Sequence, residues 1–254
     1  MPALTMRGKL KAARTMRIER RVLANDVYDV LKGMIFDQVL PPDSRVSIDV
    51  LALELDVSQT PVREALARLE GDGLVTKKAH GRYWTTPTLT ADAFEQLYNL
   101  RLVLEPFAAG EAARRIKRND LDMLTSSLDA MEASGTGGEY YQYGAFAGHD
   151  ACFHQTIASA SGNQFVADAI LRMHSHLQLA RLYRNFGIVD AAEALVDHRE
   201  ILTTLEHHDS QAATDGMRHH IDRSRSRLRL LLKERAEPVK ITPSPASRPN
   251  GGWP

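Results

Sequence analysis

Residues 51–75, LALELDVSQTPVREALARLEGDGLV, decide the fold of the N-terminal part of the chain. Apolar residues recur at helical spacing first over 51–55 and again over 62–69. Asp56-Val57 separates the two runs. Pro61 limits where the second helix begins, because proline is tolerated in the first turn of a helix. A Gly-Asp-Gly sequence then ends that helix. The stretch predicts two short helices joined by a tight turn.

The flanking sequence completes this unit. An amphipathic helix is expected before it, at about Glu19–Val39, and Leu40-Pro41-Pro42-Asp43 ends that helix. Ser47 is the expected N-cap of the next helix. Two β-prone stretches, Leu74–Thr76 and Tyr83–Thr86, enclose a basic segment and predict a hairpin. Three helices followed by a basic-tipped hairpin are typical of a winged helix-turn-helix, whose last helix enters the major groove of DNA.

Hydrogen-bonding and basic side chains occupy the positions that would face DNA in such a unit. Serine, threonine and glutamine donate to bases or phosphates, and arginine binds either one with its planar fork. Solvated surface charge is the alternative interpretation of the arginines. The expected DNA-binding residues are Arg45, Ser58, Gln59, Thr60, Arg63, Arg68, His80, Gly81 and Arg82.

Charge is unevenly divided along the chain, although its formal net charge is zero. Residues 1–85 hold 14 Lys and Arg against 11 Asp and Glu, whereas residues 86–254 hold 18 against 21. DNA is therefore expected at the basic half. The excess is small, so sequence-specific contacts have to supplement the attraction of the phosphates.

Four parts are expected in the chain: a flexible basic arm at 1–18, the winged helix-turn-helix at 19–88, an all-helical domain at 89–236 and a disordered tail at 237–254. The fold class is thus mainly α, and Pro106 is expected to kink or split the first helix of the second domain. About six helices are predicted in that domain: Ala91–Lys117, Leu121–Ala133, Glu139–Ser159, Gln164–Arg184, Asp190–His208 and Gln211–Arg235.

Cysteine content and hydropathy indicate the compartment. Cys152 is the only cysteine, which argues against a disulfide framework and against a cysteine-based zinc site. No apolar run approaches the ~20 residues of a membrane span. Met1–Ile18 lacks the apolar core of a signal peptide. We therefore expect a cytoplasmic protein with no membrane partner.

The residues from Leu51 to Val75 closely resemble the DNA-binding module of the GntR family of bacterial regulators. The resemblance implies a homodimer on a short palindromic operator, and most members of the family are repressors. Gln59 departs from the pattern because the family usually has an arginine there. Pro42-Asp43 likewise replaces the usual Pro-Gly turn.

Polar residues on the apolar faces of three predicted helices suggest a buried site. Asp150 and His154 are four residues apart and share a helix face, while His198 and His220 each lie on the inner row of another helix. One carboxylate and three imidazoles suit a divalent ion such as Zn²⁺, Ni²⁺ or Mn²⁺. Histidines that only form hydrogen bonds within the core are the alternative. The other histidines are expected to be ordinary surface or core residues.

Further segments of the helical domain resemble the effector domain of the FadR branch of that family. In metal-binding members of the branch, an aspartate and three histidines at the positions matching Asp150, His154, His198 and His220 hold the ion. The resemblance also implies that Arg101 faces an effector carboxylate, and an ion pair with Glu105 is the alternative. The segments are Leu100–Pro106, Asp150–His154, Ser161–Asn163, Asp197–Leu202 and Met217–Ile221.

These features together predict a transcription regulator in which a small organic acid binds the helical domain and changes operator affinity. A metal-dependent hydrolase is a second hypothesis, with Glu105 or Glu200 available as general base. No motif places either carboxylate beside a reacting group, so an enzyme is not expected. A regulator with a purely structural metal is the third hypothesis.

Overall fold

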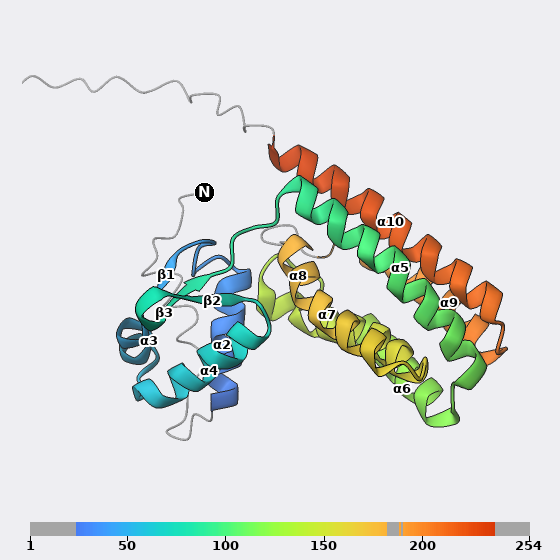
Figure 1. Cartoon of the computed structure of the whole chain (residues 1–254), viewed down its shortest axis with the longest axis horizontal. Helices are drawn as coiled ribbons and strands as arrows, with labels where there is room; N and C mark the ends of the chain where they lie inside the picture. The colour runs from blue at the N-terminus through green and yellow to red at the C-terminus, as the bar shows by residue number, and fades with distance from the viewer. Residues whose placement is uncertain (1–23, 182–187, 189, 237–254) are drawn as a thin grey trace, which may run out of the picture.

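The computed structural model describes residues 24–181, 188 and 190–236, so the expected basic arm and tail lie outside the described residues. Within this part the chain forms an N-terminal unit of helices and a small sheet, followed by a larger unit made only of helices (Figure 1). The predicted fold class, a winged helix-turn-helix joined to an all-α domain, is confirmed.

The described part of the winged helix-turn-helix consists of three helices and a three-stranded sheet. Ser47 caps α3 by accepting a hydrogen bond from the backbone N–H of Val50. The apolar row of α4, Val62, Ala65, Leu66 and Leu69, is completely buried. The sheet has the antiparallel order β1-β3-β2. The elements are α2 (Ala24–Phe36), β1 (Arg45–Val46), α3 (Ile48–Leu55), α4 (Gln59–Gly71), β2 (Val75–Lys78), a 3₁₀ turn (Ala79–Gly81) and β3 (Arg82–Thr85).

The hairpin between β2 and β3 is the wing. Its tip holds two consecutive residues in the left-handed region, His80 with φ of 63° and Gly81 with φ of 72°. Glycine adopts this conformation without a steric cost, which explains its place at the tip. No sequence pattern predicted β1, where Arg45 lies opposite Trp84, because two residues are too few to show alternation.

Within the described residues, six helices form the C-terminal domain, the number that the sequence predicts. α10 packs along α5 and α9, while α7 packs against α5, α6 and α8. None of the helices in the described ranges is long and apolar enough to cross a membrane. The helices are α5 (Ala91–Arg115), α6 (Arg118–Glu132), α7 (Tyr140–Ala160), α8 (Gln164–Arg181), α9 (Ala191–Glu206) and α10 (Ser210–Ala236).

Pro106 does not split α5, so that half of the expectation is wrong. The helix continues as one element from Ala91 to Arg115 with Pro106 buried inside it. A proline removes one backbone hydrogen bond and crowds the preceding turn. Four other helices pack against α5, and this tertiary packing stabilises the helix despite the lost bond.

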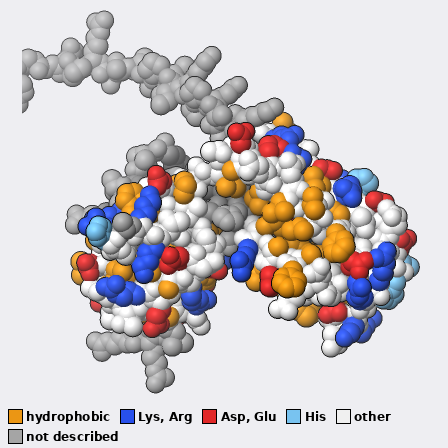
Figure 2. All heavy atoms as spheres, in the orientation of Figure 1, with side chains coloured by type: hydrophobic (Ala, Val, Ile, Leu, Met, Phe, Trp, Pro, Cys, Tyr) orange, Lys and Arg blue, Asp and Glu red, His pale blue; other side chains and the backbone are white. Residues whose placement is uncertain are grey.

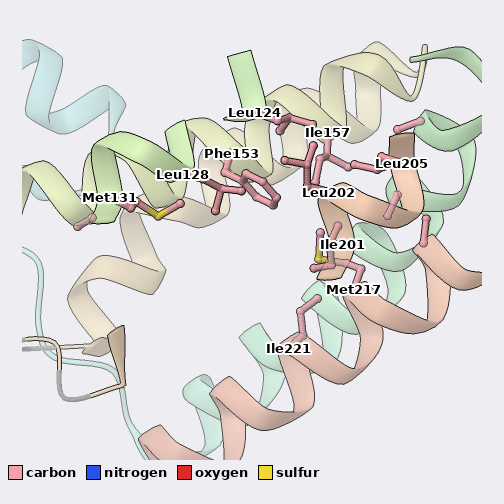
Figure 3. Close-up of a cluster of buried hydrophobic side chains, with 14 of the residues drawn as sticks. Leu124, Leu128, Met131, Phe153, Ile157, Ile201, Leu202, Leu205, Met217 and Ile221 are labelled. Carbon is pink, nitrogen blue, oxygen red and sulfur yellow. The ribbon is translucent and has the colours of Figure 1, made fainter. Parts of the chain in front are cut away.

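The core of the helical domain lies between the inner faces of α6, α7, α9 and α10 (Figure 3). Phe153 and Ile157 of α7 point into it, as do Ile201 of α9 and Ile221 of α10. Each predicted ligand histidine is a direct sequence neighbour of such a residue or lies three positions away on the same face. The apolar packing therefore brings the polar residues with it into the interior.

Candidate metal centre and nucleic-acid interface

The nine predicted DNA-binding residues are all exposed, as contact with a duplex requires. One lies in β1, four lie at or just before the first half of α4, and three lie in the wing. Arg68 lies further along α4. The residues are Arg45, Ser58, Gln59, Thr60, Arg63, Arg68, His80, Gly81 and Arg82.

A chain of hydrogen bonds fixes the side chains at the start of α4. The Gln59 amide nitrogen donates to Asp49 Oδ1 of α3 over 2.6 Å. The Gln59 amide oxygen accepts from Arg63 Nη2 over 3.1 Å. Asp49 thus determines which way the Gln59 amide faces, and Gln59 in turn holds the guanidinium of Arg63 on the exposed side of the helix.

Arg68 is bound differently from Arg63. Its Nη1 donates to Asn25 Oδ1 over 2.6 Å, and its guanidinium carbon lies 4.2 Å above the ring centre of Tyr28. The Tyr28 hydroxyl donates to Asp72 over 2.6 Å. These contacts hold Arg68 against α2, so reaching a phosphate would require it to leave both partners.

Three buried histidines converge inside the helical domain. His154, His198 and His220, from α7, α9 and α10, each offer a ring nitrogen, and these three atoms lie within 4.8 Å of one another. The Nε2 atoms of His154 and His198 are 3.3 Å apart. The side-chain exposure of each ring is 1% or less. Three helices therefore present imidazole nitrogens to one enclosed point, which is the arrangement that a metal ion requires.

Asp150 lies at the edge of this cluster. Its Oδ1 is 3.7 Å from His198 Nε2 and 3.9 Å from His154 Nε2, and the side chain is almost completely buried. The structure thus brings Asp150 close to His154 and His198. The rings of His198 and Phe153 lie against each other with centres 4.5 Å apart, which limits the rotation of that histidine.

Glu105 contacts Nδ1 of His154, the ring nitrogen opposite the Nε2 that faces His198. Its Oε2 lies 2.7 Å from His154 Nδ1, while its Oε1 accepts a hydrogen bond from Arg101 Nε over 2.6 Å. Burial raises the pKa of Glu105, but Arg101 and His154 outweigh burial and hold that pKa well below its usual range. The carboxylate is therefore ionised, and Arg101 forms the ion pair that was the alternative to its role in effector binding.

Asp197 has the same relation to His220. Its Oδ2 lies 3.3 Å from His220 Nδ1, and its Oδ1 accepts from Arg223 over 2.5 Å. Burial, followed by His154 and Arg101, lowers the pKa of His220 well below its usual range, so this ring is neutral. If Nδ1 carries the proton toward Asp197, the lone pair is on Nε2. That buried Nε2 has no hydrogen-bond partner among the described residues.

Glu105 and Asp197 are partners of the histidines that were not predicted from the sequence. A signal existed for Asp197, because it falls three residues after Ala194 and four before Ile201, on the inner row of α9. The role of Glu105 depends on how α5 packs against α7, which periodicity does not give. Among the remaining histidines, His149, His207, His208 and His219 lie outside the cluster, and the side chains of His174 and His176 lie outside the described residues.

A winged helix-turn-helix joined to a helical domain with an enclosed polar site defines a class of two-domain DNA-binding regulators. Known families agree with this. The description "Bacterial regulatory proteins, gntR family" matches residues 23–82, and "FCD domain" matches residues 96–223. The chain therefore belongs to the GntR family of transcription regulators and carries an FCD domain. These families and the relatives below are regulators rather than enzymes.

Individual relatives match most of the chain. An uncharacterized HTH-type regulator of Bacillus subtilis, YdhC, is 26% identical over 83% of this chain and 92% of its own length. A probable D-xylose utilization operon repressor of Paenarthrobacter nicotinovorans is 28% identical over 82% of this chain and 90% of its own. The solved structure of Escherichia coli McbR/YncC shares the fold, with a TM-score of 0.64 and 19% identity. The match covers 83% of this chain and 99% of that one.

Metal-free protein should lose stability as the pH falls below about 6.5, the usual pKa of histidine. His220 is neutral when folded, whereas the unfolded residue takes up a proton below that pH, so acid favours unfolding. This group alone should lower the free energy of unfolding by about 1.4 kcal/mol per pH unit. Denaturant unfolding of His220→Gln and of the exposed-neighbour control His219→Gln between about pH 7 and pH 5 measures it. Equal slopes in the two variants would contradict the assignment.

Proposed function

We propose that the chain is a ligand-responsive repressor whose helical domain binds a divalent metal ion through Asp150, His154, His198 and His220. The convergence of three buried imidazole nitrogens within 4.8 Å supports this most directly. The buried His220 Nε2 without a hydrogen-bond partner supports it further, because an enclosed polar atom is costly unless something binds it. A cation at this point would receive that lone pair.

The donor set is three imidazole nitrogens and one carboxylate oxygen. Borderline divalent ions such as Zn²⁺, Ni²⁺ and Mn²⁺ accept this combination, and an ion with more than four ligands keeps positions for effector oxygens. When bound, the ion supplies a positive charge that attracts an anionic effector. Glu105 and Asp197 are positioning residues in this proposal, because each lies at the Nδ1 of one ligand histidine and orients its ring.

Purified protein should contain close to one divalent ion per chain, and a variant with His198→Ala and His220→Ala should contain none. Asp197→Ala should weaken Zn²⁺ binding about 10- to 100-fold, because it removes the partner that orients His220. Glu95→Ala is the matched control, since Glu95 also pairs with arginines of α10, Arg225 and Arg229, and neither of them pairs with Asp197. Elemental analysis and competition with a chelator measure these values. Absence of metal from the parent, even after Zn²⁺, Ni²⁺ or Mn²⁺ is added, would refute the site.

The effector in this proposal is a small carboxylate that binds beside the ion and contacts Arg101. The guanidinium of Arg101 is buried near the cluster and pairs with Glu105. A carboxylate ligand would share it or take the place of Glu105. A relative named as a probable repressor of a sugar utilization operon supports a metabolite-responsive repressor. The nine exposed residues of the winged helix-turn-helix are then the contacts to a palindromic operator.

A carboxylate that binds the parent should change its affinity for a DNA duplex selected in vitro by at least fivefold, the usual lower range of allosteric coupling. Arg101→Gln should abolish this change while the protein still binds the duplex, and Arg63→Ala should weaken DNA binding itself. Fluorescence anisotropy with labelled DNA measures both. If chelation lowers the melting temperature but no bound carboxylate changes DNA affinity, the metal is purely structural.

The homodimer of this proposal uses the outer face of the helical domain. Hydrophobic side chains gather there over α5 and α8 (Figure 2). Leu100, Val103 and Phe107 form one exposed stripe of α5, and Phe165 and Leu171 of α8 are exposed as well. Monomeric proteins seldom leave large apolar patches in water. A second copy is the occupant that a palindromic operator calls for, because two-fold symmetry pairs the same face of both chains.

Val103→Asp should shift the protein toward a monomer, because it places a charge in the centre of the α5 stripe, where the native side chain is 68% exposed. Met123→Asp is the control, since Met123 is 51% exposed on α6, away from the α5 stripe. Light scattering after size-exclusion chromatography gives the masses. A dimer that both variants retain would place the interface elsewhere.

A further inference from the structure

Tyr140 is the first residue of α7 and contacts both units of the molecule. Its ring packs against the core of the helical domain and also against the core of the winged helix-turn-helix. The ring centre lies 5.0 Å from that of Phe36 at the end of α2 and 5.4 Å from that of Tyr143. One side chain therefore joins two hydrophobic cores.

Two glycines make room for this ring. A Cβ atom on Gly33 of α2 would lie 3.3 Å from the Tyr140 ring, and one on Gly144 of α7 would lie 3.0 to 3.2 Å from it. Real Cβ contacts are seldom that close. The ring thus lies in a close-fitting slot with one wall from each domain, which limits how far the domains can shift without losing the contact.

A hydrogen bond strengthens the same contact. The backbone N–H of Tyr140 donates to Asp37 Oδ1 over 2.6 Å, across 103 residues of sequence. This N–H belongs to the first turn of α7, where no backbone acceptor within the helix is available. A carboxylate is favoured at a helix N-terminus by the helix dipole as well. The winged domain therefore supplies a capping group to a helix of the other domain.

The helix that carries this contact also carries Asp150 and His154. Asp150 follows Tyr140 by 10 residues, which corresponds to about 15 Å along a rigid helix. Movement of α7 caused by a change at the buried site would therefore move its N-terminus against α2. No other pair of helices from the two units, within the part of the chain that the structure describes, makes as extensive a contact.

We infer that Tyr140, Phe36 and Asp37 form a joint that fixes the orientation of the winged helix-turn-helix on the helical domain, and that α7 transmits occupancy of the buried site through this joint. Tyr140 and Asp37 act as positioning residues for the DNA-binding unit. The first half of the inference stands on the contacts alone. The second half rests on the proposed function, because it requires that a metal ion binds at Asp150 and His154.

Unfolding of the full chain can test the joint, because a tryptophan reports the winged unit and helical circular dichroism reports the other unit. Trp84 and Trp253 are the only tryptophans, so Trp253→Phe leaves Trp84 of β3 to report the winged domain by fluorescence. Circular dichroism of helices reports mainly the helical domain. In this background without metal, the two transitions should coincide, as they do when a protein unfolds as one unit. Tyr140→Ala should separate them.

Tyr141→Ala is the matched control, because Tyr141 is the next residue of α7 and 78% exposed. It should leave the two transitions together. Asp37→Ala changes no residue of the helical domain and should also separate them, which keeps the test decisive if Tyr140→Ala fails to fold. Separate transitions in the parent, or coincident ones in both Tyr140→Ala and Asp37→Ala, would overturn the joint.

Added Zn²⁺ tests transmission. The metal should move the Trp84 transition of the parent to higher denaturant concentration, although its ligands all lie in the other domain. In Tyr140→Ala the Zn²⁺ affinity should stay within about twofold of the parent, and the shift of the Trp84 transition should disappear. An equal shift in both proteins would overturn transmission. If Zn²⁺ does not bind the parent, the proposed function fails, and the metal-free comparison still decides the joint.

Discussion

The helical domain depends on how it satisfies polar groups that its own packing buries. An imidazole or carboxylate in an apolar interior costs free energy unless it finds a partner. Here Asp150, Glu105 and Asp197 lie beside the three histidines, and arginines pair with the latter two carboxylates. Glu105 and Asp197 contact Nδ1 of His154 and of His220, whereas Asp150 lies beside the Nε2 atoms of His154 and His198. Burial keeps His220 neutral, and its contact with Asp197 orients the ring before any ligand arrives.

Local sequence predicted the elements well and their mutual contacts poorly. The helix rows, the Ser47 cap and the inward faces of His154, His198 and His220 follow from periodicity, because one face of each helix must be buried. Asp197 was within reach of the same argument. Partners on different helices, such as Glu105 with His154, depend on how the helices dock, and α5 remained whole at Pro106 because its neighbours support it. The contact of Tyr140 with Asp37 spans 103 residues and leaves no local pattern.

The winged unit has its own arrangement of polar groups, with exposed rather than buried partners. Asp49 orients Gln59, and Gln59 holds Arg63, so the start of α4 presents a prearranged set of donors and acceptors. Prearrangement lowers the entropy lost when side chains bind a base edge.

In the proposed function, Arg101 connects metal and effector. It neutralises Glu105, and Glu105 orients His154, so the guanidinium already has a task in the ligand-free protein. An effector carboxylate that takes this guanidinium deprives Glu105 of its main counter-charge, unless the effector lets both carboxylates share the fork. A bound ion favours sharing, because its positive charge offsets two adjacent carboxylates. Effector binding should therefore be strongest in the metal-loaded protein, and by thermodynamic reciprocity the effector should tighten the binding of the metal by the same factor.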